Sequence, residues 1–316
     1  MSPIITIQDI RAAQAVVSRA VIRTPILPLK FSDRPGVTVK CENLQRTGAF
    51  KIRGASNKIF RLPRSCRGVT ASSSGNHAQA VALAARMRGM KAVVVMLDQS
   101  LPHKVEGTRG YGAEVILGGR TSMAIRERAE REAAERGYVY VPPFDDPLII
   151  AGQGTAGLEI AQDFPDVKSV VVPVGGGGLI SGIAVAVKRS LPRVKVLGVE
   201  PEGAPKMSRA VREGRVVILE EPRTIADGLK PVCVGELTLE HVRKYVDGMV
   251  LVSDEEILEA ARHLLLKEKL VVEPSGAASV AAVRSGKLRL PRGPAVCVLS
   301  GGNADLGMIL GFPAGA

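Results

Sequence analysis

The chain has 316 residues, 46% of them hydrophobic and 23% charged, a composition typical of a large α/β protein with a sizeable core. The formal net charge is +12, but the excess is spread thinly, only 3% of residues are aromatic and there is no Trp, so no surface for stacking bases is expected. The start of the chain lacks a signal-peptide pattern, no segment approaches the roughly 20 apolar residues of a membrane span, and the four cysteines form no CxxC pair. We therefore expect a reduced, cytoplasmic protein that binds neither nucleic acid nor membrane.

Start signals and charge patterns place several helices. Thr6, followed three residues later by an aspartate, is a capping-box-like start for a helix over 7–20. The stretch 126–136 alternates basic and acidic residues, which indicates a solvated helix face. Ser253 with Glu256 predicts another capped helix near the end of the chain.

Apolar runs that end in small or turn residues alternate with these helical segments. They lie at 37–42, 69–73, 91–97, 113–119, 138–141, 169–176, 195–200, 248–254 and 295–302. Strands that are apolar along their whole length and separated by helices indicate parallel sheets covered by helices on both faces. Two such sheets fit the length. Ligands of these folds bind at the carboxyl ends of the strands, where glycine turns let the backbone approach closely.

Lys51 stands in an unusual setting, the stretch TGAFKIRGA at 47–55. Surface lysines usually have polar neighbours, whereas this one follows Gly48, Ala49 and Phe50 in what looks like a tight, partly apolar turn. A desolvated lysine loses proton affinity and becomes a usable nucleophile or base. On this stretch alone, a lysine that extends its ammonium to solvent is the alternative.

Four consecutive glycines at 175–178 follow an apolar strand and precede an apolar helix, in VVVPVGGGGLISG. Successive glycine amides at a helix start are suited to a phosphate. A turn without a ligand is the alternative, although four glycines carry a large backbone entropy cost. No Lys-Ser or Lys-Thr follows, and Ser181 falls where a GxGxxG motif needs its last glycine, so neither a P-loop nor a dinucleotide fingerprint is present.

Two further turns carry polar side chains. TASSSGNHAQA, at 70–80, offers hydroxyls, an amide and helix-start N–H groups that suit a carboxylate, although a simple helix-capping cluster is the alternative. Ser300 in CVLSGGNADLG ends a buried strand, so we expect its hydroxyl to point into the cleft. A lysine amine, a phosphate site and a carboxylate site together are what a pyridoxal phosphate enzyme acting on an amino acid requires.

The chain resembles the threonine dehydratase and serine racemase group of fold-type II pyridoxal phosphate enzymes. The resemblance runs nearly end to end, through FKIRGA, SSGNHAQA, PFDDPLIIAGQGT, VGGGGLISGIA, GVEPE, TIADG, VVEPSGA and LSGGNADL. It implies a tryptophan synthase β-like α/β fold with two domains, each a mostly parallel sheet covered by helices. Residues 1–67 and 146–316 would form the large cofactor-binding domain and 68–145 the small substrate-binding domain. It also implies a homo-oligomer, with a dimer favoured.

The resemblance also implies a role for each matching residue. Lys51 would form the Schiff base with the cofactor and act as the base on one face of its ring. Phe50 and Gly228 would flank the ring, Asn76 would bind its 3-oxygen and Ser300 its pyridine nitrogen. The phosphate would be held by Gly175, Gly176, Gly177, Gly178 and Leu179, and the substrate carboxylate would be surrounded by Ser73, Ser74, Asn76 and His77.

The expected reaction is β-elimination of L-threonine and L-serine to 2-oxobutanoate or pyruvate and ammonia. Ser300 supplies no negative charge to keep the pyridine nitrogen protonated, which favours prompt loss of a β-leaving group. Serine racemase is the alternative, because Ser74 stands where racemases have a second acid–base group opposite Lys51, whereas Phe144 is dehydratase-like. A non-catalytic amino-acid-binding protein would not need Lys51.

A metal site is not expected. Racemase-like members bind a divalent ion through the glutamate of the GVEP motif, a carbonyl four residues on and an aspartate six residues on. Here these positions are Glu200, Ala204 and Lys206. Replacing a carboxylate by an ammonium changes the local charge by two units and disfavours a hard cation. We therefore expect no tightly bound Mg²⁺ or Ca²⁺, with Lys206 paired to Glu200 in its place.

Overall fold

The computed structural model describes residues 4–30, 36–73 and 75–311, and its elements follow the predicted alternation of strands and helices. The strands are β1 Ile26–Pro28, β2 Val37–Lys40, β3 Gly68–Ser72, β4 Lys91–Met96, β5 Glu114–Leu117, β6 Val139–Tyr140, β7 Ser169–Pro173, β8 Lys195–Pro201, β9 Gly248–Val252 and β10 Ala295–Val298. The helices are α1 Ile7–Val17, α2 Lys51–Phe60, α3 Asn76–Met87, α4 Pro102–Gly110, α5 Ser122–Arg136, α6 Pro147–Asp163, α7 Gly178–Ser190, α8 Lys206–Glu213, α9 Glu236–Tyr245, α10 Asp254–Leu266, α11 Pro274–Arg284 and α12 Leu306–Leu310, with short 3-10 turns η1 Glu42–Leu44 and η2 Asp227–Leu229.

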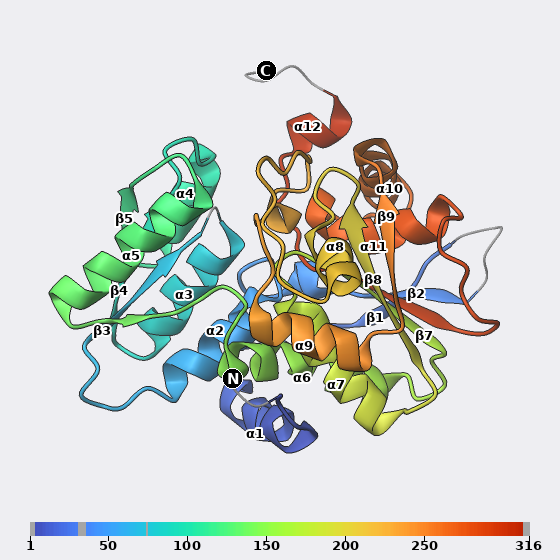
Figure 1. Ribbon diagram of the computed structural model, residues 1–316, viewed down its shortest axis with the longest axis horizontal. Helices are drawn as coiled ribbons and strands as arrows, with labels where there is room; N and C mark the ends of the chain where they lie inside the picture. The colour runs from blue at the N-terminus through green and yellow to red at the C-terminus, as the bar shows by residue number, and fades with distance from the viewer. Residues whose placement is uncertain (1–3, 31–35, 74, 312–316) are drawn as a thin grey trace.

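The strands form two sheets, which lie side by side in Figure 1. Six described strands make the larger sheet in the order β1-β2-β10-β7-β8-β9, and four make the smaller one in the order β5-β4-β3-β6. Each pairing is parallel except that of β1 with β2, where Ile26 faces Lys40 in an antiparallel register. The expected α/β class with mostly parallel sheets is confirmed. The strands of the smaller sheet lie between Gly68 and Tyr140 in the chain.

The larger sheet is buried on both faces because successive residues of each strand point to opposite sides. In β7, Val171 belongs to an apolar cluster with α10 and α11, whereas Val170 and Val172 belong to a second cluster with α7 and α9. The same division holds in β10, where Cys297 faces the first cluster and Val296 the second. Strands buried on both faces have apolar residues along their whole length, which is why they could be predicted from the sequence.

Helix α2 connects the two sheets. Ile52, Ala55 and Ile59 pack into the apolar cluster of the smaller sheet, together with residues of β3 and α3. Its opposite side meets α6, where a β carbon on Gly152 would lie 2.6 Å from the Arg53 carbonyl oxygen, so no larger residue fits there. Lys51, the first residue of α2, therefore starts at the junction between the sheets.

Several local predictions are confirmed, and the strand ends differ slightly. Thr6 forms the predicted capping box and so does Ser253, although α1 ends at Val17 rather than at 20. The runs 169–176 and 295–302 leave their sheet at Pro173 and Val298, because the glycine and serine residues that follow form the turns of the site. The four cysteines are free thiols. No helix in the described part of the chain is long and apolar enough to cross a membrane.

Candidate active site

Two segments far apart in the chain meet beside Lys51. The backbone N–H of Phe50 donates to the carbonyl oxygen of Ser300 at 3.1 Å, and Ala49 forms a bridge with Gly301. Gly48 has a φ of +68°, a conformation that favours glycine. The turn before α2 is therefore held against the loop that follows β10, as expected for two turns at the carboxyl side of one sheet.

The Lys51 amine is partly buried and has one close polar neighbour. Its Nζ donates to the carbonyl oxygen of Pro143 at 2.7 Å and lies 5.2 Å from the centre of the Phe50 ring. Burial lowers the pKa of Lys51 to about 8 from its usual 10.5. Its position at the start of α2 acts in the same direction, because a helix N-terminus disfavours positive charge. Roughly a tenth of the amine is therefore uncharged at pH 7, far more than for an ordinary lysine.

The glycine turn, Gly175–Gly178, presents unpaired backbone donors. Within the described residues, the N–H groups from Gly175 to Leu179 have no acceptor from the protein. Gly177 caps α7 with a φ of +96°, and Gly176 lies so close to the Phe144 ring that a β carbon on it would be 2.2 Å away. Consecutive unpaired N–H groups at a helix start are the donor set that a phosphate group takes. The phosphate of pyridoxal phosphate therefore fits the residues that are present.

Gly228 and Ser300 are joined to each other through Ser275, and Gly228 touches the glycine turn. The Gly228 N–H donates to the Ser275 hydroxyl at 2.8 Å, and the Ser300 hydroxyl lies 3.5 Å from the Ser275 carbonyl oxygen. A β carbon on Gly175 would lie 2.7 Å from the Gly228 carbonyl oxygen, so these two loops touch. Among the residues that the structure describes, this long interaction is the only one of the buried Ser300 hydroxyl, which leaves it able to bind a ring nitrogen.

Asn76 contacts two residues to which the sequence interpretation gave no role. Its Nδ2 donates to Oε1 of Glu273 at 2.5 Å, and its Oδ1 accepts from Nδ2 of Asn303 at 2.8 Å. Burial raises the pKa of Glu273 to about 7, and the charge of Lys104 opposes that increase. Both residues stand inside quoted motifs, VVEPSGA and LSGGNADL, but only the tertiary structure brings them to Asn76.

The loop that precedes α3 is partly described. Nε2 of the buried His77 lies 2.9 Å from the Val141 carbonyl oxygen, which can only accept, so Nε2 carries the proton. Burial, with the charge of Lys51, lowers the pKa of His77 to about 3, and the ring is neutral. The Ser73 hydroxyl accepts from the Gly75 N–H at 3.1 Å. Ser74 lies outside the described residues, so the predicted carboxylate site stays a prediction.

An ion pair that the sequence did not suggest joins the two sheets beside Gly228. Nζ of Lys104, from α4, lies 2.8 Å from Oδ2 of Asp227 in η2. The Lys104 side chain is buried and that of Asp227 is 46% exposed. The pair therefore spans the two halves of the molecule at one end of the site.

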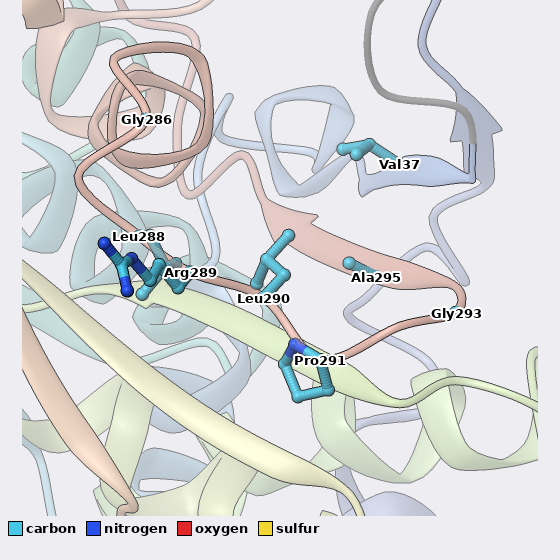
Figure 2. A pocket seen from close by; sticks show the side chains of 8 residues that line it. All are labelled: Val37, Gly286, Leu288, Arg289, Leu290, Pro291, Gly293 and Ala295. Atoms are coloured by element: carbon cyan, nitrogen blue, oxygen red, sulfur yellow. The ribbon is translucent and has the colours of Figure 1, made fainter.

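A separate cavity lies elsewhere in the molecule. This cavity of about 380 Å³ is lined by Leu288, Arg289, Leu290 and neighbouring residues, whose side chains are drawn in Figure 2. It borders Val37 and Ala295, which are the first residues of β2 and β10, so it lies at the amino ends of these strands. Ligands of open α/β sheets bind at the opposite, carboxyl ends, and this cavity holds none of the predicted site residues.

The residues of the suggested metal position do not fit a divalent ion. The predicted pair of Lys206 with Glu200 is present, with Nζ 3.2 Å from Oε1. The ammonium also donates to the Ala204 carbonyl oxygen at 3.0 Å, so it stands among the oxygens that a metal would need. In the described part of the chain, no group of three or more His, Cys, Asp or Glu side chains is placed to hold a metal.

The family model described as pyridoxal-phosphate dependent enzyme matches residues 17–301. The chain belongs to this family. The cofactor predicted from the sequence, pyridoxal phosphate, is therefore confirmed, whereas the roles of Lys51 and of the glycine turn in holding it stay predictions.

Members of known activity are similar along nearly the whole chain. The L-threonine ammonia-lyase of Thermotoga maritima is 48% identical over 96% of this chain and 77% of its own length. The catabolic L-threonine dehydratase TdcB of Staphylococcus aureus is 41% identical over 98% of this chain and 92% of its own length. Among solved structures, the T.th. threonine deaminase is 45% identical over 95% of this chain and 99% of its own, with a TM-score of 0.90. Maize serine racemase is 37% identical over 98% of this chain and 97% of its own, with a TM-score of 0.93.

Proposed function

We propose that this pyridoxal phosphate enzyme is an L-threonine ammonia-lyase that also acts on L-serine. The observation that carries the proposal is the Lys51 amine, whose pKa is lowered to about 8 by burial, in a chain 48% identical to a threonine ammonia-lyase. The products are 2-oxobutanoate from threonine, or pyruvate from serine, and ammonia.

The residues that would hold the cofactor are those described above. The N–H groups of Gly175–Leu179 bind the phosphate, Phe50 and Gly228 cover the two faces of the ring, Asn76 binds its 3-oxygen, and Ser300 meets its nitrogen. When bound, pyridoxal phosphate withdraws electrons from the α-carbon of an attached amino acid. Ser300 is a neutral partner for the ring nitrogen, so this withdrawal is moderate and favours departure of a β-hydroxyl group.

Lys51 has two tasks in this proposal. Its amine would be the group that holds the cofactor through the aldehyde, and Nζ would be the base that takes the α-proton of the substrate. The β-hydroxyl group leaves as water, and a second water hydrolyses the remaining imine to the 2-oxo acid and ammonia, so atoms balance. Ser73, Ser74, Asn76 and His77 would fix the substrate carboxylate. His77 would contribute its backbone N–H, because the neutral ring gives its one N–H to the Val141 carbonyl oxygen.

The test is production of 2-oxobutanoate from L-threonine by the purified protein, compared with two variants. Lys51→Ala should lose turnover while it keeps its fold, because the phosphate donors are backbone groups elsewhere. Lys58→Ala is the matched control, since Lys58 lies on the same helix but pairs with Asp146. Near-normal turnover by Lys51→Ala would contradict the proposal.

Serine racemase activity is the second candidate, favoured by the likeness to maize serine racemase. Racemisation needs a proton donor on the ring face opposite Lys51, and Ser74 is the residue proposed for it. Ser74→Ala should remove conversion of L-serine to D-serine and leave most of the threonine elimination. Equal loss of both activities would mean that Ser74 orients the substrate instead.

We also propose that residues 1–67 and 146–316 form the cofactor-binding domain and 68–145 the substrate-binding domain of a cytoplasmic homodimer. The position of the smaller sheet between Gly68 and Tyr140 supports the division, and the four free thiols support a reducing compartment. Light scattering on the purified protein tests the dimer.

A further inference from the structure

Lys206 is a fully buried lysine, with 0% of its side chain exposed, behind the glycine turn. Its Nζ has four oxygen neighbours: the carbonyl oxygens of Leu229 at 2.9 Å, Ala204 at 3.0 Å and Val174 at 3.4 Å, and Oε1 of Glu200 at 3.2 Å. One carboxylate and three carbonyl oxygens around one positive charge form the kind of oxygen shell that a hard cation takes in proteins.

The Glu200 carboxylate is fixed on its other side by the start of α8. Oε1 accepts from the Met207 N–H at 2.8 Å, and Oε2 accepts from the Ser208 N–H at 2.8 Å and its hydroxyl at 2.7 Å. A helix N-terminus stabilises a negative charge, and so does the neighbouring ammonium. The buried shell is therefore electrically neutral as a whole, which is the condition under which charges are tolerated inside a protein.

Two of the carbonyl groups belong to the loops that hold the cofactor. Val174 immediately precedes Gly175, and Leu229 immediately follows Gly228. Within the described residues, the structure gives these two carbonyl oxygens no other donor, and a buried carbonyl left unpaired is costly. The Lys206 ammonium thus adds a hydrogen-bonded link between the loop of the phosphate site and the loop beside the ring, which also touch at Gly175 and Gly228.

We propose that the Lys206 ammonium is a built-in cation that positions these two loops and so sets the affinity of the enzyme for pyridoxal phosphate. Lys206 touches no reacting atom and is a positioning residue. The proposal goes beyond the lyase reaction, because it concerns the holding of the cofactor and is independent of the substrate. It has a further consequence: replacing the ammonium by a carboxylate should turn the oxygen shell into a divalent metal site.

The experiment titrates pyridoxal phosphate into the cofactor-free full-length protein and follows its visible absorbance. Lys206→Met should bind the cofactor at least about tenfold more weakly, because small displacements of positioning groups have large effects, and Mn²⁺ should not restore it. Lys206→Asp should be similarly weak in EDTA, bind Mn²⁺ as seen by electron paramagnetic resonance, and regain cofactor affinity when Mn²⁺ is added. The wild-type protein should bind the cofactor equally in EDTA and in Mn²⁺.

Lys40→Met is the matched control. The ammonium of Lys40 is also fully buried, donating to the Thr24 carbonyl oxygen and to Glu159, both at 2.6 Å, and neither partner belongs to the loops of the cofactor site. This variant should lose stability without losing cofactor affinity. Because neither titration uses a substrate, failure of the lyase assignment would leave both results unchanged.

Unchanged cofactor affinity in Lys206→Met would overturn the proposal. So would absence of Mn²⁺ binding by Lys206→Asp, or bound Mn²⁺ that leaves the cofactor affinity low. If Lys206→Met does not fold, the comparison of Lys206→Asp with and without Mn²⁺ decides by itself.

Discussion

The Asn76 amide donates to the Glu273 carboxylate at 2.5 Å, and this contact joins the start of α3 to the start of α11. It connects a residue next to the smaller sheet with one next to the larger sheet, at the position proposed for the 3-oxygen of the cofactor. Glu273 is buried, and Lys104 is the cation that opposes the rise of its pKa. The contact therefore connects the two halves of the molecule through a carboxyl group whose pKa is raised by burial.

The ionisation of Glu273 should make the cofactor-free protein less stable as the pH rises. The pKa of Glu273 is about 7 in the folded protein and 4.5 for an ordinary glutamate. Between these two pH values the folded protein therefore binds more protons than the unfolded protein does. Its free energy of unfolding falls as the pH rises through this range. Glu273→Gln keeps an acceptor for Asn76 but cannot ionise. It should be more stable than the wild type at pH 8, by at most about 3 kcal/mol, and similar to it at pH 4.5 or below.

Urea unfolding at several pH values checks this prediction. Glu221→Gln is the control, because Glu221 is 72% exposed and pairs with Arg223 at the surface. A gain for Glu273→Gln that is the same at all pH values would point to packing rather than ionisation.

The capture of pyridoxal phosphate by Lys51 should follow the lowered pKa of its amine. With a pKa of about 8, roughly a tenth of the amine is uncharged at pH 7 and most of it at pH 9, so the rate should rise about tenfold over that range and then level off. An ordinary lysine would continue to gain about eightfold between pH 9 and pH 10. Stopped-flow absorbance on the cofactor-free protein distinguishes the two curves, and a continued rise would show that burial does not activate the amine.

The pair of Lys104 with Asp227 should assist closure of the site around the substrate. Because Asp227 is 46% exposed, the pair is worth about 0.5–1 kcal/mol, so Lys104→Met and Asp227→Asn should each raise the KM for L-threonine by roughly two- to fivefold. The double variant should have a KM no higher than that of the single variant with the larger increase, because the two side chains act through one contact. Additive effects would assign the residues to separate tasks.

The buried charges around Arg53 should be required for stability. The guanidinium is fully buried and donates to both Glu42 and Glu159, which also accepts from Lys40. Arg53→Met should lower the free energy of unfolding by about 3–5 kcal/mol, because two carboxylates lose their main partner. Arg126→Met is the control. Arg126 pairs with Glu130 at the surface, so this substitution should lower the free energy of unfolding by less than about 1 kcal/mol. Denaturant unfolding measures both, and equal costs would contradict the argument.

The sequence by itself determined the class of fold and the chemical groups of the site. Capping boxes at Thr6 and Ser253, the apolar strands and the four consecutive glycines are local patterns whose meaning comes from backbone geometry, so they could be interpreted without neighbours. The apolar and tight setting of Lys51 predicted a lysine of low pKa, in agreement with its burial. The strand ends were less well predicted, because the chain leaves each sheet where the turns of the site begin.

Only the tertiary structure decided which distant residues meet. Glu273 beside Asn76, and Asp227 beside Lys104, come from segments on different sheets, and no periodicity in the chain relates them. The pairing of Lys206 with Glu200 was within reach of the sequence, because the two residues are close in the chain. The contacts of Lys206 with the carbonyl oxygens of Val174 and Leu229 could not be predicted from the sequence. These two residues lie in separate loops, and only the folded backbone directs both carbonyl groups toward the same ammonium. Local chemistry sets the elements, whereas packing of the whole chain sets the charges and hydrogen bonds of the site.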